Sequence, residues 1–353
     1  MDEEFVYVDL ESVEKGTILH ENVISRDDAP SRAQRVLKFN DILFQCVRPY
    51  QKNNLLFSGD THTLQYVAST GYAQIRTDKQ NPAFLYQLLN TQKFVDQVML
   101  RCTGTSYPAI NANDLSKIPI CYPLQIEEQN KIAKLLSLLD NRIETQKKVI
   151  EKYESLIKGI SNKLLYADKG IPVRLGDILL ERSERTKVNN QHEVLSSTVK
   201  GIFSQREYFS KEIASENNIG YKIIHLHDVV LSPQNLWMGN INYNDKYDIG
   251  IVSPSYKIFS IAEGYDKLFV SALLKTHRAL YNYMLVSEQG ASVVRRNLNM
   301  EAFEQLVFKM PSIDKQREVG NTISALQSRI ELAIRVKTAY EKQKQWLLTE
   351  MFI

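Results

Sequence analysis

Two long stretches of the chain repeat apolar side chains with the period of a helix that packs along a narrow seam. Residues 126–165 contain no proline, and residues 311–353 show the same periodicity. The heptad positions expected to form the seam are Ile132, Leu136, Leu139, Ile143, Ile150, Tyr153 and Ile157 in the first stretch, and Val319, Ile323, Leu326, Ile330, Tyr340 and Leu347 in the second. The pattern predicts two helices, the first of them about 60 Å long.

The seam has two interpretations. A helix that only covers its own globular domain shows a broader apolar stripe, whereas a narrow seam of 3.5-residue period is typical of a helix that pairs with another helix. Because the first helix leads into a second globular part and the second helix leaves that part, we expect the pair to be antiparallel. Gln146, Lys337 and Lys344 interrupt the seam. We expect them to set the register or to contact another protein chain.

The sequence also repeats itself over a long distance. Asp41 aligns with Asp228, a shift of 187 positions (228 − 41), and the same shift aligns nine identical residues in the two helical stretches. The identical residues are Ile126, Gln129, Ser137, Leu139, Arg142, Ile143, Glu144, Tyr153 and Glu154 in the first copy. Solenoid units are only roughly 20–50 residues long, so each copy is expected to be a whole domain followed by a helix. The second copy opens with residues 173–178, whose counterparts would precede residue 1, so we expect the first domain to lack its opening segment.

The two globular parts show mixed patterns. The runs at 5–8, 42–47, 221–226 and 249–252 are rich in β-branched and aromatic residues and predict strands, while 82–101 and 267–286 predict helical runs. The expected fold class is α+β, with two tandem mixed α/β domains separated and joined by two long helices that form an antiparallel coiled coil. The predicted boundaries are 1–122 and 169–310 for the domains, and 123–168 and 311–353 for the spacer helices.

Composition narrows the class of protein without deciding the function. Hydrophobic residues make up 43% and charged residues 24% of the chain, which are ordinary values for a globular protein. No apolar stretch approaches the ~18 residues of a membrane span, and the first residues are acidic, so we expect a cytoplasmic protein without membrane contact. The net charge of +3 neither requires nor excludes nucleic acid.

Motifs for catalysis or metal binding are weak. The odd number of cysteines, without a C-x-x-C pair, argues against disulfides and structural zinc and predicts buried cysteines. Residues 253–256 partly resemble the N-P-P-Y tetrapeptide of amino-methyltransferases but lack its first residue and second proline, so a turn is favoured. His225 and His227 share one strand face, yet the repeat has no histidine at the matching positions, which disfavours a metal site. We expect a non-catalytic chain without a metal.

Polar, basic and aromatic side chains gather in loops at matched positions of the two copies. They include the side-chain types that bind base edges and phosphates. The candidate DNA-binding residues are Arg48, Tyr50, Lys52, Asn53, Thr105, Ser106, Tyr107 and Asn111 in the first copy, and Gln234, Asn235, Trp237, Ser292, Arg295, Arg296 and Asn297 in the second. Polar loops are usually only solvated, but their recurrence on both domains favours a role in nucleic-acid binding.

Several segments resemble the specificity (S) subunit of type I restriction-modification systems, in an order that extends over essentially the whole chain. The closest matches are residues 104–111 and the segment 119–129 that enters the first helix. Residues 39–49 look like the "GDILFS-VRP" run of that family, and residues 173–178 look like the usual opening of its target-recognition domains.

The resemblance implies two target-recognition domains, each of which reads one half of a bipartite site in double-stranded DNA, with the coiled helices setting the gap. It implies no enzymatic activity and no cofactor in this chain. The expected partners are two modification (methyltransferase) subunits, which carry S-adenosylmethionine, and the restriction subunits of the full complex. The alternative is a non-catalytic coiled-coil scaffold that joins two protein-binding domains without DNA specificity. A methyltransferase fragment is disfavoured because the cofactor motifs are absent.

Overall fold

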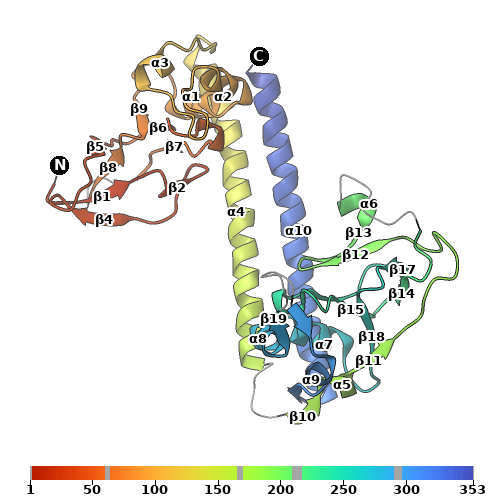
Figure 1. Cartoon of the computed structure of the whole chain (residues 1–353). Helices are drawn as coiled ribbons and strands as arrows, with labels where there is room; N and C mark the ends of the chain where they lie inside the picture. The colour runs from red at the N-terminus through yellow and green to blue at the C-terminus, as the bar shows by residue number, and fades with distance from the viewer. Residues whose placement is uncertain (1, 60–63, 165–169, 209–216, 290–295, 353) are drawn as a thin grey trace. The chain divides into compact units, whose positions relative to one another are not determined.

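The computed structural model describes residues 2–59, 64–164, 170–208, 217–289 and 296–352. Contacts divide the chain into two compact units: unit 1 contains Met1–Lys148 and Ile334–Ile353, and unit 2 contains Val149–Ala333. The long helices predicted from the heptads are α4 (Ile126–Leu164) and α10 (Ile313–Met351), and each unit includes a segment of both (Figure 1). No helix among the described residues is long and apolar enough to cross a membrane.

Unit 1 contains two small sheets. The first has the order β4 (Asn22–Ser25), β1 (Glu4–Val8), β8 (Gln65–Ser69), β5 (Ala33–Val36), with β1 parallel to β8 and the other pairs antiparallel. The second is antiparallel, with the order β7 (Leu55–Leu56), β6 (Ile42–Gln45), β9 (Tyr72–Ile75). A short hairpin is formed by β2 (Val13–Glu14) and β3 (Thr17–Ile18), and the shorter helices are α1 (Pro82–Leu89), α2 (Gln92–Met99) and α3 (Ala112–Ser116).

Strand β6 is the centre of unit 1 because both of its faces are buried. Ile42 and Phe44 point into a cluster built with α1 and α2, while Leu43 points into a second cluster with β1 and Tyr72. Alternate residues of a strand face opposite sides, so this one strand connects both clusters. The loop that follows β6 therefore starts from a rigid support.

Unit 2 repeats this plan with additional strands. Its largest sheet has the order β11 (Leu179–Arg182), β18 (Lys257–Ile261), β15 (Val229–Leu231), β16 (Ile241–Tyr243). The paired strands are β10 (Ile171–Arg174) with β21 (Val307–Met310), β12 (Leu195–Thr198) with β13 (Gly201–Ser204), β14 (Lys222–His225) with β17 (Ile249–Val252), and β19 (Ser287–Gln289) with β20 (Arg296–Leu298). The shorter helices are α5 (Leu175–Ile178), α6 (Gln205–Tyr208), α7 (Lys267–Leu274), α8 (His277–Leu285) and α9 (Met300–Glu304).

Strand β15 of unit 2 corresponds to β6 of unit 1. Val229 and Leu231 enter the cluster built with α7 and α8, and Val230 enters the opposite cluster. The 187-residue shift pairs Val229 with Ile42, Val230 with Leu43 and Leu231 with Phe44. The duplication inferred from the sequence thus extends to which face of the central strand each side chain covers.

Two details of the sequence-based prediction need correction. The helical runs predicted at 82–101 and 267–286 are each broken into two helices. The side chains of Thr91 and Thr276 cap the second helix of each run by accepting the amides of Phe94 and Ala279. The cysteines are not all buried either: Cys46 is buried, Cys102 is intermediate and Cys121 is exposed. By contrast, residues 253–256 do form the expected turn between β17 and β18.

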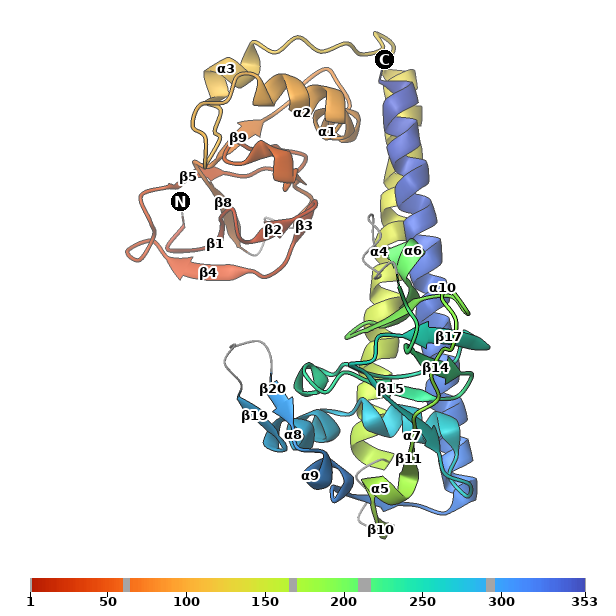
Figure 2. The ribbon, with the colours of Figure 1, turned by 45° about the vertical axis from the view of Figure 1, so that its right-hand side comes forward.

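In unit 1 the two long helices lie side by side and antiparallel (Figures 1 and 2). Arg142 on α4 donates to the hydroxyl of Tyr340 on α10 at 3.2 Å, and Lys344 donates to Asp140 at 2.6 Å, so later residues of one helix meet earlier residues of the other. Lys344, one of the polar residues that interrupt the seam, therefore pairs with the other long helix. Lys337 instead pairs with Glu341 of its own helix.

The seam is more than a contact between the two helices. Leu136 and Leu139 are fully or nearly fully buried, whereas Ile143 and Ile150 are only half-buried. In unit 2, Ile157 of α4 packs against the core cluster that contains Val319 and Ile323 of α10. The two interpretations of the helices are therefore both partly correct, because the helices contact each other and also complete the core of the globular part in their unit.

Candidate nucleic-acid interface

A buried aspartate lies at the start of the central strand in each unit. Asp41 accepts the amide of Lys38 at 2.7 Å, and Asp228 accepts the amide of His225 at 2.7 Å, which closes the same three-residue turn. An arginine completes each site: Arg76 binds Asp41 through two bonds of 2.7 Å, and Arg182 binds Asp228 at 3.2 Å. The repeat had shown the aspartates but not their arginine partners, which lie at unmatched positions.

The environments shift the pKa of the two carboxyl groups in opposite directions. Burial favours the neutral acid at both sites. At Asp41 the bonds from Arg76, the Lys38 amide and Gln74 outweigh this effect, so its pKa is lowered. At Asp228 burial dominates over the His225 amide and Arg182, so its pKa is raised.

A buried glutamine joins each long helix to the domain that precedes it. The Gln129 side chain accepts the amide of Asn81 at 2.9 Å and donates to the Pro123 carbonyl at 2.8 Å. The matching Gln316 accepts the amide of Asp266 at 3.0 Å and donates to the Pro311 carbonyl at 2.8 Å. Because Asn81 and Asp266 cap α1 and α7, each glutamine fixes where the long helix leaves its domain. Sequence reasoning had found these glutamines as repeat identities without giving them a role.

Two loops meet in unit 1 at the end of β6. The loop after β6 contains the short helix η1 (Pro49–Gln51), and the second loop joins α2 to α3. Ile110 donates its amide to the Cys46 carbonyl at 3.0 Å, and Arg48 donates its amide to the Pro108 carbonyl at 2.8 Å. These bonds fix the two loops against each other.

The meeting point carries an arginine stacked on an aromatic ring. The guanidinium carbon of Arg48 lies 4.2 Å from the centre of the Tyr107 ring, a distance typical of a cation–π contact. Tyr107 is 64% exposed. Two residues predicted to bind DNA, 59 positions apart in the sequence (107 − 48), are therefore in direct contact.

The other candidates in unit 1 divide into exposed residues and residues with structural partners. Tyr50, Thr105 and Ser106 are exposed. The Lys52 ammonium donates to Gln92, the Asn53 side chain accepts the amide of Lys15, and Asn111 caps α3 by accepting the amide of Asp114, so these three side chains also hold the fold. Burial lowers the pKa of Lys52, against the opposing charge of Asp96.

Unit 2 has the same pair of loops. The loop after β15 contains the short helix η2 (Leu236–Met238), and the second loop follows α8 and includes β19 and β20. Arg296 donates its amide to the Gln234 carbonyl at 3.2 Å, and its guanidinium carbon lies 4.6 Å from the centre of the Trp237 ring. A second arginine–aromatic pair therefore lies at the matching place.

The remaining candidates of unit 2 lie around this pair. Gln234 and Asn297 are exposed, and Asn235 is half-buried next to η2. Ser292 and Arg295 lie outside the described residues.

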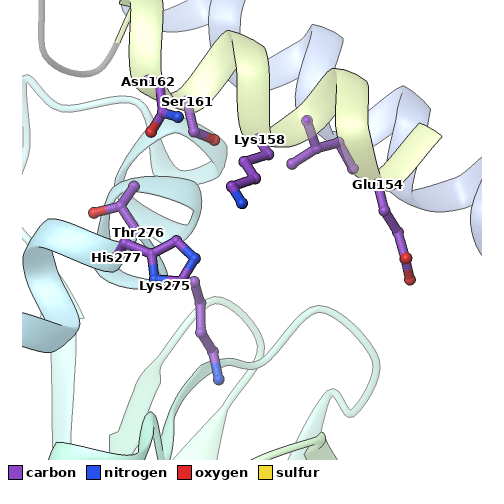
Figure 3. Close-up of a pocket in the computed structure, with 8 residues that line it drawn as sticks. Glu154, Lys158, Ser161, Asn162, Lys275, Thr276 and His277 are labelled. Carbon is purple, nitrogen blue, oxygen red and sulfur yellow. The ribbon is translucent and has the colours of Figure 1, made fainter. Parts of the chain in front are cut away.

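A small pocket of about 250 Å³ lies elsewhere in unit 2, between the last turns of α4 and the junction of α7 with α8 (Figure 3). Its lining includes Lys158, Ser161 and His277. The Lys275 ammonium is directed away from α4 and donates to the Gly239 carbonyl at 2.8 Å. The volume is below the range of roughly 300–1,000 Å³ typical of small-molecule sites. The loop pairs therefore remain the stronger candidates for ligand binding.

Comparison with known proteins agrees with this geometry. Residues 37–154 match the family model described as "Type I restriction modification DNA specificity domain". The chain is 26% identical over 160 residues to the HindI specificity subunit of Haemophilus influenzae and 31% identical over 162 residues to the MjaVIII specificity subunit of Methanocaldococcus jannaschii, both named as subunits of type I restriction enzymes. The chain is therefore similar, over part of its length, to type I restriction-modification specificity subunits. The aligned segments span 44% of this chain and only 34% and 38% of those relatives.

Solved structures support the fold. The crystal structure of a type I restriction-modification S subunit from M. genitalium has a TM-score of 0.63 at 14% identity, covering 99% of this chain and 88% of that one. A chain from a structural study of type I R-M complex assembly has a TM-score of 0.52 at 19% identity, covering 99% of this chain and 91% of that one. At this level of identity the similarity establishes the architecture of two mixed domains with paired long helices.

Proposed function

We propose that this chain is the sequence-specific DNA-recognition subunit of a type I restriction-modification complex, and that each unit reads one half of a bipartite site. The observation that carries the proposal is the recurrence of one loop pair on one scaffold. In both units the loop after the central strand meets the loop after the second helix, and both meeting points hold an arginine stacked on an aromatic ring. Arginine and aromatic side chains projecting from rigidly supported loops suit contact with DNA.

The long helices are proposed to set the gap between the two half-sites. Both are unbroken over 39 residues. Two binding modules gain effective concentration from a connection only when it matches the distance between their sites. A stiff connection therefore selects half-sites at one separation, whereas a flexible linker would accept several.

The chemistry is proposed to be carried out by partner subunits in the cytoplasm. Two modification subunits would supply methyl transfer from S-adenosylmethionine, and restriction subunits would complete the complex, while this chain contributes no catalytic group. Exposed apolar side chains on the helix segments of unit 1, namely Leu135, Leu138 and Trp346, support a protein partner there.

A selection experiment tests the proposal. The full chain, alone and with its modification subunit, is incubated with double-stranded DNA of random interior sequence, and the bound fraction is sequenced. We expect enrichment of two short motifs at one fixed separation. Binding to the modification subunit without enrichment of any motif would instead support the scaffold without DNA specificity.

A further inference from the structure

We propose that unit 1 carries a docking site for a segment of another polypeptide chain. The segment forms a short strand, a helical turn with two apolar side chains three positions apart, and a second strand. The site consists of the backbone at residues 119–122 and the edge of β9. Residues 171–182 have the required pattern and occupy the matching place in unit 2. The proposal does not depend on DNA recognition.

In unit 2 one continuous segment covers two strands (Figure 1). Strand β10 pairs antiparallel with β21, α5 follows, and β11 then pairs antiparallel with β18. Leu175 donates its amide to the Leu306 carbonyl at 2.7 Å, and the Ile178 carbonyl accepts the amide of Ala262 at 2.9 Å. The side chains of Leu175 and Ile178 are fully buried in the cluster built with α7 and α8. Backbone pairing at both ends and two buried side chains between them hold the segment.

Two landmarks identify the matching place in unit 1. Asn111 and Asn299 cap α3 and α9 in the same way, each by accepting the amide three residues further on. Pro123 and Pro311 each have a carbonyl that accepts a bond from the glutamine side chain at the start of the long helix. Both pairs are separated by 188 positions (299 − 111 and 311 − 123). Residues 119–122 therefore match β21.

This stretch of unit 1 has no partner strand among the described residues. Within the same residues, the amides of 120–122 form no hydrogen bond, and the Ile118 carbonyl, which matches that of Leu306, accepts none. Side-chain burial differs in the same sense, because Met310 of β21 is 3% exposed and the matching Tyr122 is 38% exposed. An extended backbone with unpaired N–H and C=O groups is a template for an added strand.

The second strand of the segment has an unpaired counterpart as well. In unit 2, β18 lies between β11 and β15, whereas the described part of unit 1 pairs β9 only with β6. The registers match Phe259 of β18 with Ile75 of β9, because these residues lie opposite the matched Val229 and Ile42. Phe259 is buried and Ile75 is only half-buried. The two edges that one segment covers in unit 2 are thus both open in the described part of unit 1.

The occupant is expected to come from a different chain. Residues 171–182 already serve unit 2, and their transfer to unit 1 of a second copy would open one site for every site that it closes. A separate segment closes the site without that loss. It needs apolar side chains at the positions of Leu175 and Ile178, because these share one cluster with Phe308, whose counterpart in unit 1 is the half-buried Ile120.

The probe for the test is a fluorescent synthetic peptide of residues 170–182, added to the full chain. We expect saturable one-to-one binding in fluorescence anisotropy. Amide hydrogen exchange should become slower at residues 118–122 and 74–77 together. It should stay unchanged at residues 307–310, because unit 2 holds its own segment at a high effective concentration.

Paired substitutions test the contact itself. In the peptide, Leu175→Asp or Ile178→Asp should weaken binding by about tenfold or more, since each removes an apolar side chain that is buried on docking. In the full chain, Tyr122→Asp should also weaken binding, whereas Tyr122→Met, which has the side chain found at this place in unit 2, should bind at least as well as the wild type. Val307→Asp, at an exposed position of β21, is the matched control and should leave binding unchanged.

Four outcomes would overturn the proposal. Absence of saturable binding, or binding that the aspartate substitutions do not change, would remove the site. Slow exchange at 118–122 in the monomer without peptide would show that this edge is closed within the chain. Concentration-dependent dimers that protect the same amides without peptide would identify a second copy as the occupant. None of these measurements involves DNA, so failure here is distinguishable from failure of the proposed function.

Discussion

At the residue scale, the duplicated aspartates show how one position acquires opposite electrostatics. Asp41 and Asp228 close the same turn, yet the pKa of Asp41 is lowered and that of Asp228 is raised. A lowered pKa means that Asp41 stabilises the fold above its unfolded pKa and loses this contribution as the pH falls through the folded value. A raised pKa means that the contribution of Asp228 is largest below its unfolded pKa and is lost as the pH rises.

Asparagine substitutions test these signs. We expect Asp41→Asn to lower the free energy of unfolding by roughly 1.5–3 kcal/mol near neutral pH, because charged hydrogen bonds are lost, and by less at about pH 3. Asp228→Asn should show the reverse trend, with the larger loss at about pH 3. Urea denaturation at the two pH values measures both. The same pH trend in the two variants would contradict the opposite pKa shifts of Asp41 and Asp228.

The candidate residues show which part of the site was predictable. The sequence places Arg48, Tyr107, Trp237 and Arg296 in matched loops, but the stacked pairs could not be foreseen because each joins residues far apart in the chain. Asn111 was predicted to bind DNA because of its side-chain type, whereas in the structure its side chain caps α3. The residue types of a loop indicate what the loop can bind. The path of the backbone decides which of those side chains form hydrogen bonds within the protein instead.

At the element scale, the helices were predictable because the heptad pattern extends over many turns. The break of each shorter helical run was missed because it depends on one capping threonine, Thr91 or Thr276, within an otherwise apolar segment. Sheet order was equally inaccessible, since β1 pairs with β8 across about 60 residues.

A pair of leucines on α4 tests the packing of the long helix. Leu136 has no exposed surface and Leu138 is 52% exposed. Leu136→Ala should lower the free energy of unfolding by roughly 2–5 kcal/mol through the lost contacts and the cavity left behind. Leu138→Ala, with the same chemical change two residues away, should stay within about 0.5 kcal/mol of the wild type. Equal losses in thermal or urea unfolding would show that the buried face of α4 has been assigned incorrectly.

At the scale of the whole molecule, the duplicated domain and its helix form the repeated structural unit. Each copy supplies a central strand buried on both faces, a loop pair with a stacked arginine, and a glutamine that fixes the departure of the long helix. Under the proposed function, two such copies give two reading positions from one architecture, and their different loop residues allow the half-sites to differ.

The most direct test of the account is the gap between the two half-sites after both helices are shortened. The contacts of Arg142 with Tyr340 and of Asp140 with Lys344 place residues 144–147 and 336–339 near one another on the paired segments, so these are the four-residue deletions to combine. One helical turn is about 5.4 Å and a base pair rises about 3.4 Å, so sequencing of the methylated sites should show a gap shorter by about one to two base pairs with both half-site motifs unchanged. An unchanged gap in an active, folded variant would contradict the claim that the helices set the spacing.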